Sequence, residues 1–149
     1  MKLRQWFLTL LCLGMLAVSP AYAAGGTREE AQAMCEKAVE LIKSAGPEQA
    51  FAQFQKADGG FIDRDLYVFV LDGKGNFMAH GAKPVLVGKG GLAMKDVTGF
   101  AFIQAFMDVK DRGWVDYKWP DQSQNNQIRD KSTYIIHEGD YVVGVGYYK

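Results

Sequence analysis

The spacing of apolar residues changes near residues 58–60 (DGG), and this change limits the folds open to the chain. Before it, apolar residues recur at helical spacing and predict an amphipathic helix over 27–45 and a shorter one from Pro47. Thr27 and Glu30 form a capping-box pattern at the start of the first helix. After residue 60, short β-branched and aromatic runs are typical of strands.

The second part of the sequence predicts five strands and one more helix. Residues 66–71 (LYVFVL) are apolar on both faces, as in a central strand, and residues 76–80 return from the turn at 72–75. A glycine-rich connection covers 81–97, and such long connections usually have a function. A helix is expected over 98–110, with strands over 114–119, 131–137 and 141–148. Five largely antiparallel strands with a connecting helix make an α+β domain.

The first 23 residues have the pattern of a secretory signal peptide. Lys2 and Arg4 precede an apolar run over 6–18, and Ala21-Tyr22-Ala23 fits a cleavage site. The alternative is a membrane anchor, but a spanning helix needs about 20 apolar residues. Cleavage after Ala23 is therefore expected, leaving one domain over 24–149 in the periplasm or outside the cell.

Charge and cysteine content exclude some functions for residues 24–149. Without Lys2 and Arg4, 15 basic residues face 17 acidic ones, a net charge of about −2, and no basic tract remains. A nucleic-acid partner is therefore not expected. Cys35 is the one cysteine left, so no disulfide can form within the domain, and its place on the helical stripe favours a buried, unreactive thiol.

The residue types needed for catalysis do not come together in the sequence. The two histidines, His80 and His137, lack the cysteine or acidic neighbours of a zinc site. No nucleophile elbow, calcium loop or dinucleotide-binding glycine pattern is present. We therefore expect a protein that is not an enzyme and that uses no cofactor or metal.

The segment GWVDYKWP at 113–120 is the strongest candidate for a binding surface. In a strand, Tyr117 and Trp119 share one face and Trp114 lies on the other, and Pro120 is expected to end the strand. A lysine beside aromatic rings and hydroxyl groups suits a small carboxylate, and Lys131 opens the next predicted strand.

Two further residues, Tyr134 and His80, could donate hydrogen bonds to such a ligand. Each candidate also has a structural alternative. Trp114 and Trp119 could pack in the core, Lys131 could be a solvated strand end, and His80 could cap a strand.

Several stretches together resemble a single Cache domain of the second type, a small-molecule sensing module of bacterial receptors. They are DLYVFVLDGKGNFMAHG (65–81), LVGKG (86–90), KDVTG (95–99), GWVDYKWPD (113–121), KSTYI (131–135) and YVVGVGYY (141–148). The resemblance implies a long N-terminal helix and a PAS-like antiparallel sheet. It implies a small organic acid or similar polar ligand bound by Tyr117, Lys131, Trp114, Tyr134 and His80.

The expected function is therefore extracytoplasmic binding of a short carboxylate. Family members usually pass a signal through a membrane helix, and none follows Tyr148 here, so a stand-alone form with a separate membrane receptor is expected. The alternative is a protein-interaction module that acts with a receptor, or as a homodimer through residues 27–45. An enzyme of unrecognised type is a third hypothesis.

Overall fold

Helix α1 (Arg28–Ala45) begins at the predicted capping box. In the computed structural model, which describes residues 25–149, the Glu30 N–H donates to Thr27 Oγ1 (3.2 Å) and the Thr27 N–H donates to Glu30 Oε2 (2.8 Å). Gly46, with a φ of +83°, ends α1, and Pro47 begins α2 (Pro47–Phe54). Both expected helices are confirmed. The predicted signal peptide lies outside the described residues.

Six antiparallel strands form the sheet of the described chain, in the order β1-β2-β6-β5-β4, with β3 also paired to β2. The bounds are β1 (Ile62–Asp63), β2 (Leu66–Asp72), β3 (Phe77–His80), β4 (Arg112–Asp121), β5 (Gln127–Glu138) and β6 (Tyr141–Tyr148). The five predicted strands are all present, and β1 is an additional strand of two residues. The α+β fold class is confirmed.

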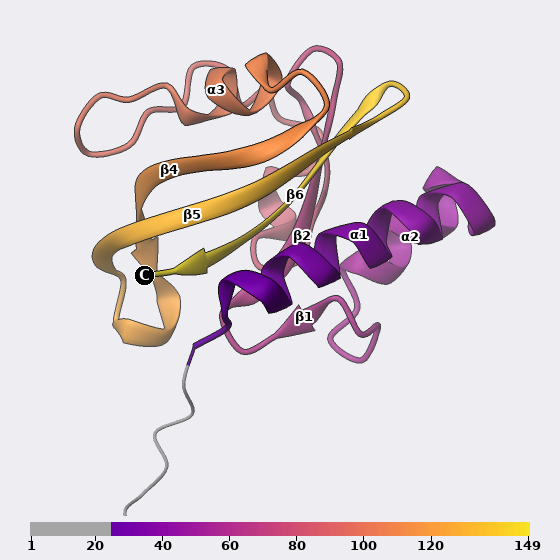
Figure 1. The fold of residues 1–149 in the computed structure, drawn as a ribbon, viewed down its shortest axis with the longest axis horizontal. Coiled ribbons are helices and arrows are strands. Elements are labelled where there is room, and N and C mark those ends of the chain that lie inside the picture. Colours follow the sequence, from indigo (N-terminus) through magenta and orange to yellow (C-terminus); the bar gives the residue numbers. More distant parts are fainter. Residues whose placement is uncertain (1–24) are drawn as a thin grey trace, which may run out of the picture.

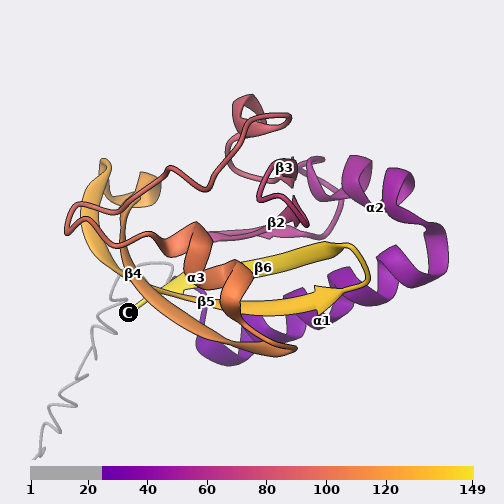
Figure 2. The same ribbon diagram turned by 90° about the horizontal axis from the view of Figure 1, so that it is seen from above.

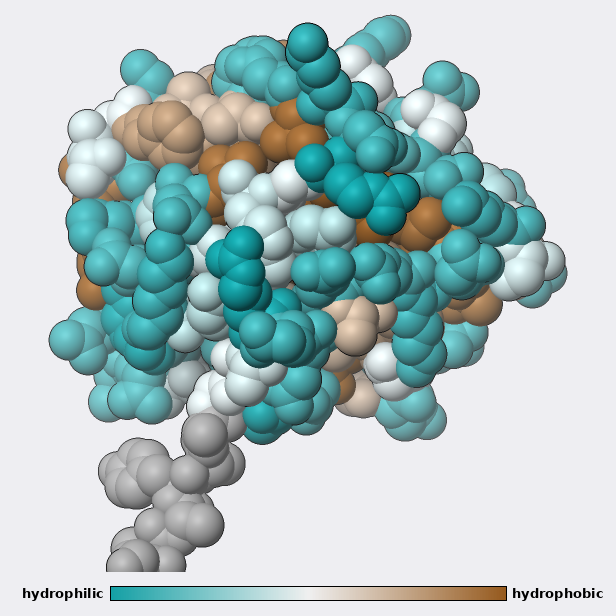
Figure 3. Space-filling model, viewed as in Figure 1, coloured by the Kyte–Doolittle hydropathy of each residue, from teal (hydrophilic) through white to brown (hydrophobic). Residues whose placement is uncertain are grey.

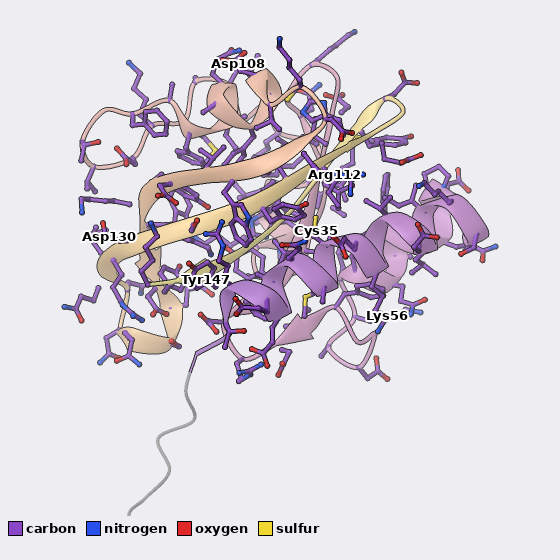
Figure 4. The ribbon with its side chains drawn as sticks, viewed as in Figure 1. Cys35, Lys56, Asp108, Arg112, Asp130 and Tyr147 are labelled. Atoms are coloured by element: carbon purple, nitrogen blue, oxygen red, sulfur yellow. The ribbon has the colours of Figure 1, made fainter. Side chains whose placement is uncertain are left out.

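Helices cover both faces of the sheet, and each face has its own core (Figures 1 and 2). On one face, α1 and α2 pack on β2, β5 and β6, and Cys35 is buried with its Sγ 3.5 Å from the Val143 carbonyl oxygen. Figure 4 shows Cys35 on the side of α1 that meets the sheet, and burial raises its thiol pKa. On the other face, α3 (Phe102–Asp108) packs Phe102 and Phe106 against Phe69 of β2.

The third helix is shorter than the predicted 98–110, because Asp96 holds the preceding residues in a turn. The Asp96 Oδ1 accepts the Thr98 N–H (2.8 Å) and the Phe100 N–H (3.0 Å), and Gly99 has a φ of +87°. Its Oδ2 accepts the Lys118 N–H of β4 (2.9 Å). A single carboxylate therefore ties the connection between β3 and α3 to the edge of the sheet.

The β4–β5 hairpin is longer than predicted at its turn. Pro120 lies inside β4 and pairs with Ile128, and β5 begins at Gln127 rather than Lys131. Proline is accommodated because β4 is an edge strand and one side of its backbone needs no partner strand. The turn itself is short, with Asn125 and Asn126 at positive φ. This longer pairing fixes the side chains of Tyr117 and Lys131 relative to each other.

The face of the molecule seen in Figure 3 is largely hydrophilic. Figure 3 shows hydrophobic residues in small separate areas on the face seen in Figure 1. Several of the exposed apolar side chains belong to the connection between β3 and α3, among them Val85, Val97 and Phe100. No helix within residues 25–149 combines the length and apolar character needed to cross a membrane.

Candidate functional site

Strand β4 presents its aromatic residues to both faces of the sheet, as its alternation predicts. β4 and β5 pair without a register shift, so Tyr117 lies opposite Lys131 and Trp114 lies opposite Tyr134. Tyr117 and Trp119 pack with the α3 core, whereas Trp114 and Tyr134 pack with the α1 core. The five candidate residues therefore fall into two groups on opposite faces.

Trp114 and Tyr134 belong to an aromatic group beneath α1. Their ring centroids are 4.9 Å apart, the Tyr147 ring lies 5.8 Å from that of Trp114, and the Arg28 guanidinium is 4.0 Å above the Trp114 ring. Figure 4 labels Tyr147 beside the first turns of α1. The structure does not bring Trp114 or Tyr134 together with Lys131, because strand parity turns them to the other face. For Trp114, packing in the core is the alternative that the sequence left open.

Lys131 lies at the centre of the other group. It is 1% exposed, its Nζ donates to the Tyr67 hydroxyl (3.0 Å), and the same Nζ is 4.4 Å from the ring centroids of Tyr67 and Tyr148. Gly146 makes room for it, since a Cβ at that position would lie 2.6 Å from Lys131 Cε. The expectation of a solvated strand end does not apply, because β6 and β2 enclose this side chain.

The Lys131 ammonium has no acidic partner among residues 25–149, where every ion pair involves other side chains. Burial lowers its pKa below the usual lysine value, and Tyr117, Asp65 and Asp121 oppose that effect. An ammonium has three N–H donors, and one of them is used. The arrangement leaves a desolvated positive charge with unused donors, which is costly without an anion.

Two tyrosines contribute hydroxyl groups near this charge. The Tyr117 hydroxyl lies 3.1 Å from Thr133 Oγ1, and its ring stacks on Phe102 at 4.7 Å between centroids. Burial raises the pKa of Tyr117 to about 12 and raises that of Tyr67 as well, so both hydroxyls keep their protons near neutral pH. Tyr67 was not predicted as a site residue, because its apolar surroundings in LYVFVL make it look like ordinary core.

His80 completes the group on this face. It is 4% exposed and its ring stacks on Tyr67 at 5.0 Å. Burial, together with the charges of Lys131 and Lys83, lowers its pKa to about 3, so the ring is neutral. Its Nδ1 accepts the Lys83 N–H (3.0 Å), which assigns the ring proton to Nε2. His80 thus carries an N–H donor at Nε2.

Two cavities beside this group share Tyr67 and Trp119 as lining residues, and Lys131 lines neither of them. Lys131 contributes instead, together with Tyr117, to a separate, open hollow of about 440 Å³. The inner cavity, about 20 Å³, is the smaller of the two and is lined by aromatic and apolar side chains together with His80 and Tyr117. That volume is close to the space of one water molecule. The outer cavity, about 210 Å³, opens between the β1–β2 turn, residues 82–83 and the end of β4, with Tyr148 in its wall. Trp119, which the GWVDYKWP segment already contained, therefore joins the candidate site together with Tyr148 and Lys83, which were not predicted as site residues.

Comparison with known proteins identifies the family of this chain. The sequence profile described as Single Cache domain 2 matches residues 12–149. A crystal structure of a methyl-accepting chemotaxis protein from Vibrio parahaemolyticus RIMD 2210633 is similar, with a TM-score of 0.68 and 25% identity over 80% of this chain and 86% of that one. Comparison with curated proteins gives no match.

Two further solved structures share the fold at 22% identity. One is described as the structural basis for carboxylic acid recognition by a Cache chemosensory domain, with a TM-score of 0.61 over 80% of this chain and 86% of that one. The other is the periplasmic sensor domain of a chemotaxis protein, with a TM-score of 0.60 over 80% and 88%. Because the profile matches most of this chain, the chain belongs to the single Cache domain 2 family.

Proposed function

We propose that this domain is an extracytoplasmic sensor that binds a short carboxylate through the Lys131 ammonium. The observation that carries the proposal is the buried charge: Lys131 is 1% exposed, has one hydrogen bond and forms no ion pair with residues 25–149. A ligand carboxylate would supply the missing anion and accept the unused N–H donors. The Cache chemosensory domain described as recognising carboxylic acids supports this ligand class.

The neighbouring groups suit the two ends of such a ligand. The Tyr117 and Tyr67 hydroxyls and the His80 Nε2–H are donors near Lys131, and they favour an acceptor rather than a cation. The rings of Phe69, Phe102 and Phe106 provide an apolar wall for a short carbon chain. The same donors and rings do not form a nucleophile–base pair, which favours sensing without catalysis.

Ligand entry requires the site to open, because the inner cavity of about 20 Å³ is too small for an organic acid. The segment most suited to move is the connection over residues 81–101, which contributes Leu86 and Met94 to the cavity wall. Asp96 anchors this segment to β4 through the Lys118 N–H. We expect ligand binding to change the mobility of residues 81–101, as hydrogen exchange with and without ligand would show.

The proposal also includes where the protein is located and which partners receive its signal. Residues 1–23 would be a signal peptide cleaved after Ala23, and N-terminal sequencing of the exported protein beginning at Met1 would contradict this. The signal would pass to a separate membrane receptor, or to a second copy of the chain through the exposed side of α1. Light scattering that shows a monomer at high concentration, with and without ligand, would exclude the second copy.

Thermal unfolding of the purified protein against short carboxylates, amines, amino acids and urea tests the proposal. A ligand at 100 times its dissociation constant adds about 2.7 kcal/mol of stability, which raises the Tm of a domain of this size by several degrees. We expect shifts from carboxylates alone. Shifts from amines or urea with none from carboxylates would contradict the assignment of Lys131.

A further inference from the structure

The outer cavity adds a second positive group to the site. Its wall includes Tyr67, Tyr148 and Trp119, and the Lys131 ammonium lies 4.4 Å from the centroids of the first two rings. Lys83 also lines this cavity, with its Nζ 5.0 Å from the Trp119 ring centroid. The two lysines thus approach the same aromatic wall, Lys131 from the protein interior and Lys83 from the cavity side.

Lys83 resembles Lys131 in lacking an acidic partner within the described chain. It is half-buried, and burial, followed by the charge of Lys131, lowers its pKa. Its backbone is held in place because its N–H donates to His80 Nδ1. Lys83 therefore lines the outer cavity, whereas Lys131 lies behind the Tyr67 and Tyr148 rings of its wall. The two ammonium groups repel each other, and an anion between them would relieve that repulsion.

Most acidic groups around the outer cavity are already engaged. Asp121 is 1% exposed, and its carboxylate accepts hydrogen bonds from the Ser123 N–H and hydroxyl and from the Arg129 guanidinium (2.7 Å). Arg64 forms ion pairs with Asp63 and Glu30. Asp65 is the remaining acid, and it accepts the Gly26 N–H at the mouth of the cavity. Within residues 25–149, Lys83 and the buried Lys131 behind the cavity wall are therefore the lysines near this cavity that form no ion pair, and the charges of Asp65 and Asp121 partly balance that of Lys131.

We propose that the ligand carries two acidic groups, with one carboxylate on Lys131 and the second on Lys83 in the outer cavity. This inference rests on the proposed function and names its ligand class as a dicarboxylate rather than a monocarboxylate. The outer cavity, about 210 Å³, is below the usual range for drug-sized ligands and suits a short diacid. The Trp119 ring, which lines both cavities, would contact the carbon chain between the two acidic groups.

Calorimetry with matched acids tests the inference, using succinate against butyrate and malonate against propionate. In each pair one methyl group is replaced by a carboxylate. At low salt, where a half-exposed lysine is least screened, we expect the diacid to bind about tenfold tighter, as one charge-assisted hydrogen bond predicts. In Lys83→Met the ratio of diacid to monocarboxylate affinity should fall to about threefold or less. Lys89→Met, an exposed lysine of the same connection, is the matched control and should keep the preference.

Each result separates the inference from the proposed function. If monocarboxylates bind and diacids bind no tighter, the dicarboxylate class is wrong and the proposed function stands. If no carboxylate of either kind binds to the folded protein, both are wrong. A diacid preference that survives Lys83→Met would also overturn the role of Lys83. In Asp65→Asn, which removes the opposing charge and keeps an acceptor for the Gly26 N–H, we expect tighter diacid binding; weaker binding would contradict the proposal.

Discussion

Replacing Lys131 with methionine should separate binding from stability. Methionine keeps an unbranched, flexible side chain that fits beside Gly146, and it removes the ammonium. Because that charge has no acidic partner among residues 25–149, its removal breaks no ion pair and leaves no carboxylate unpaired. We therefore expect Lys131→Met to lose carboxylate binding while the empty protein stays at least as stable.

The magnitudes follow from the contacts of the side chain. Loss of a charge-assisted hydrogen bond to the ligand costs about 1.5–3 kcal/mol, or roughly 10- to 150-fold in affinity. For the empty protein, loss of the hydrogen bond to the neutral Tyr67 hydroxyl costs about 1 kcal/mol. Removal of a desolvated charge offsets this loss, since replacing buried ionic groups with apolar ones is often neutral or stabilising by about 1–4 kcal/mol. The expected net change in the free energy of unfolding lies between about zero and 3 kcal/mol of gain.

Urea unfolding measures the free energy of unfolding, and calorimetry on the same samples measures the affinity for the carboxylate. Lys118→Met is the control, because Lys118 lies on the same hairpin, has a side chain that is 43% exposed and forms an ion pair with Asp130. It should change stability by less than about 1 kcal/mol and leave affinity unchanged. A loss of about 3–5 kcal/mol in Lys131→Met, as when a structural ion pair is broken, would refute the reasoning.

Three more perturbations test separate parts of the structure. His80 has a pKa lowered to about 3 against 6.5 when unfolded, so the folded state binds fewer protons in that window. The neutral ring therefore contributes to the free energy of unfolding above pH 6.5, and this contribution declines by up to about 1.4 kcal/mol per pH unit as the pH falls. In His80→Asn, the free energy of unfolding should depend less on pH between pH 6.5 and 5 than in the unchanged protein. Gly146→Ala, whose Cβ would meet Lys131 Cε at 2.6 Å, should weaken carboxylate binding and cost about 1–3 kcal/mol of stability, whereas Gly73→Ala, with 3.9 Å of clearance, should do neither. Trp114→Leu should lower stability by about 1–2 kcal/mol and leave affinity unchanged, because Trp114 packs beneath α1; a large loss of affinity would return it to the ligand site.

The sequence predicted the elements of this fold well because local patterns determine them. Residues 27–45 carry both the apolar stripe and the capping box of α1, and alternation in GWVDYKWP assigned Tyr117 and Trp114 to opposite faces. The helix expected over 98–110 was too long, because the Asp96 hydrogen bonds depend on where β4 lies in space. Contacts of that kind are not visible in helical spacing.

Part of the candidate site was predicted from local patterns, and the rest depends on how the strands are arranged in space. Tyr117, Lys131 and His80 share one face because β4, β5 and β3 carry them there, and Tyr117 and Lys131 lie directly opposite each other. Tyr67 reaches Lys131 only through the β2–β6–β5 order of the sheet, which joins strands far apart in the sequence. Lys83 comes from an irregular connection, where no periodicity indicates the direction of a side chain.

A crystal structure of the protein with the carboxylate that stabilises it most would test the central claim directly. We expect a ligand carboxylate oxygen about 2.7–2.9 Å from Lys131 Nζ, with the carbon chain against the α3 face of the sheet. A ligand bound elsewhere, with Lys131 still bonded to Tyr67 alone, would contradict it.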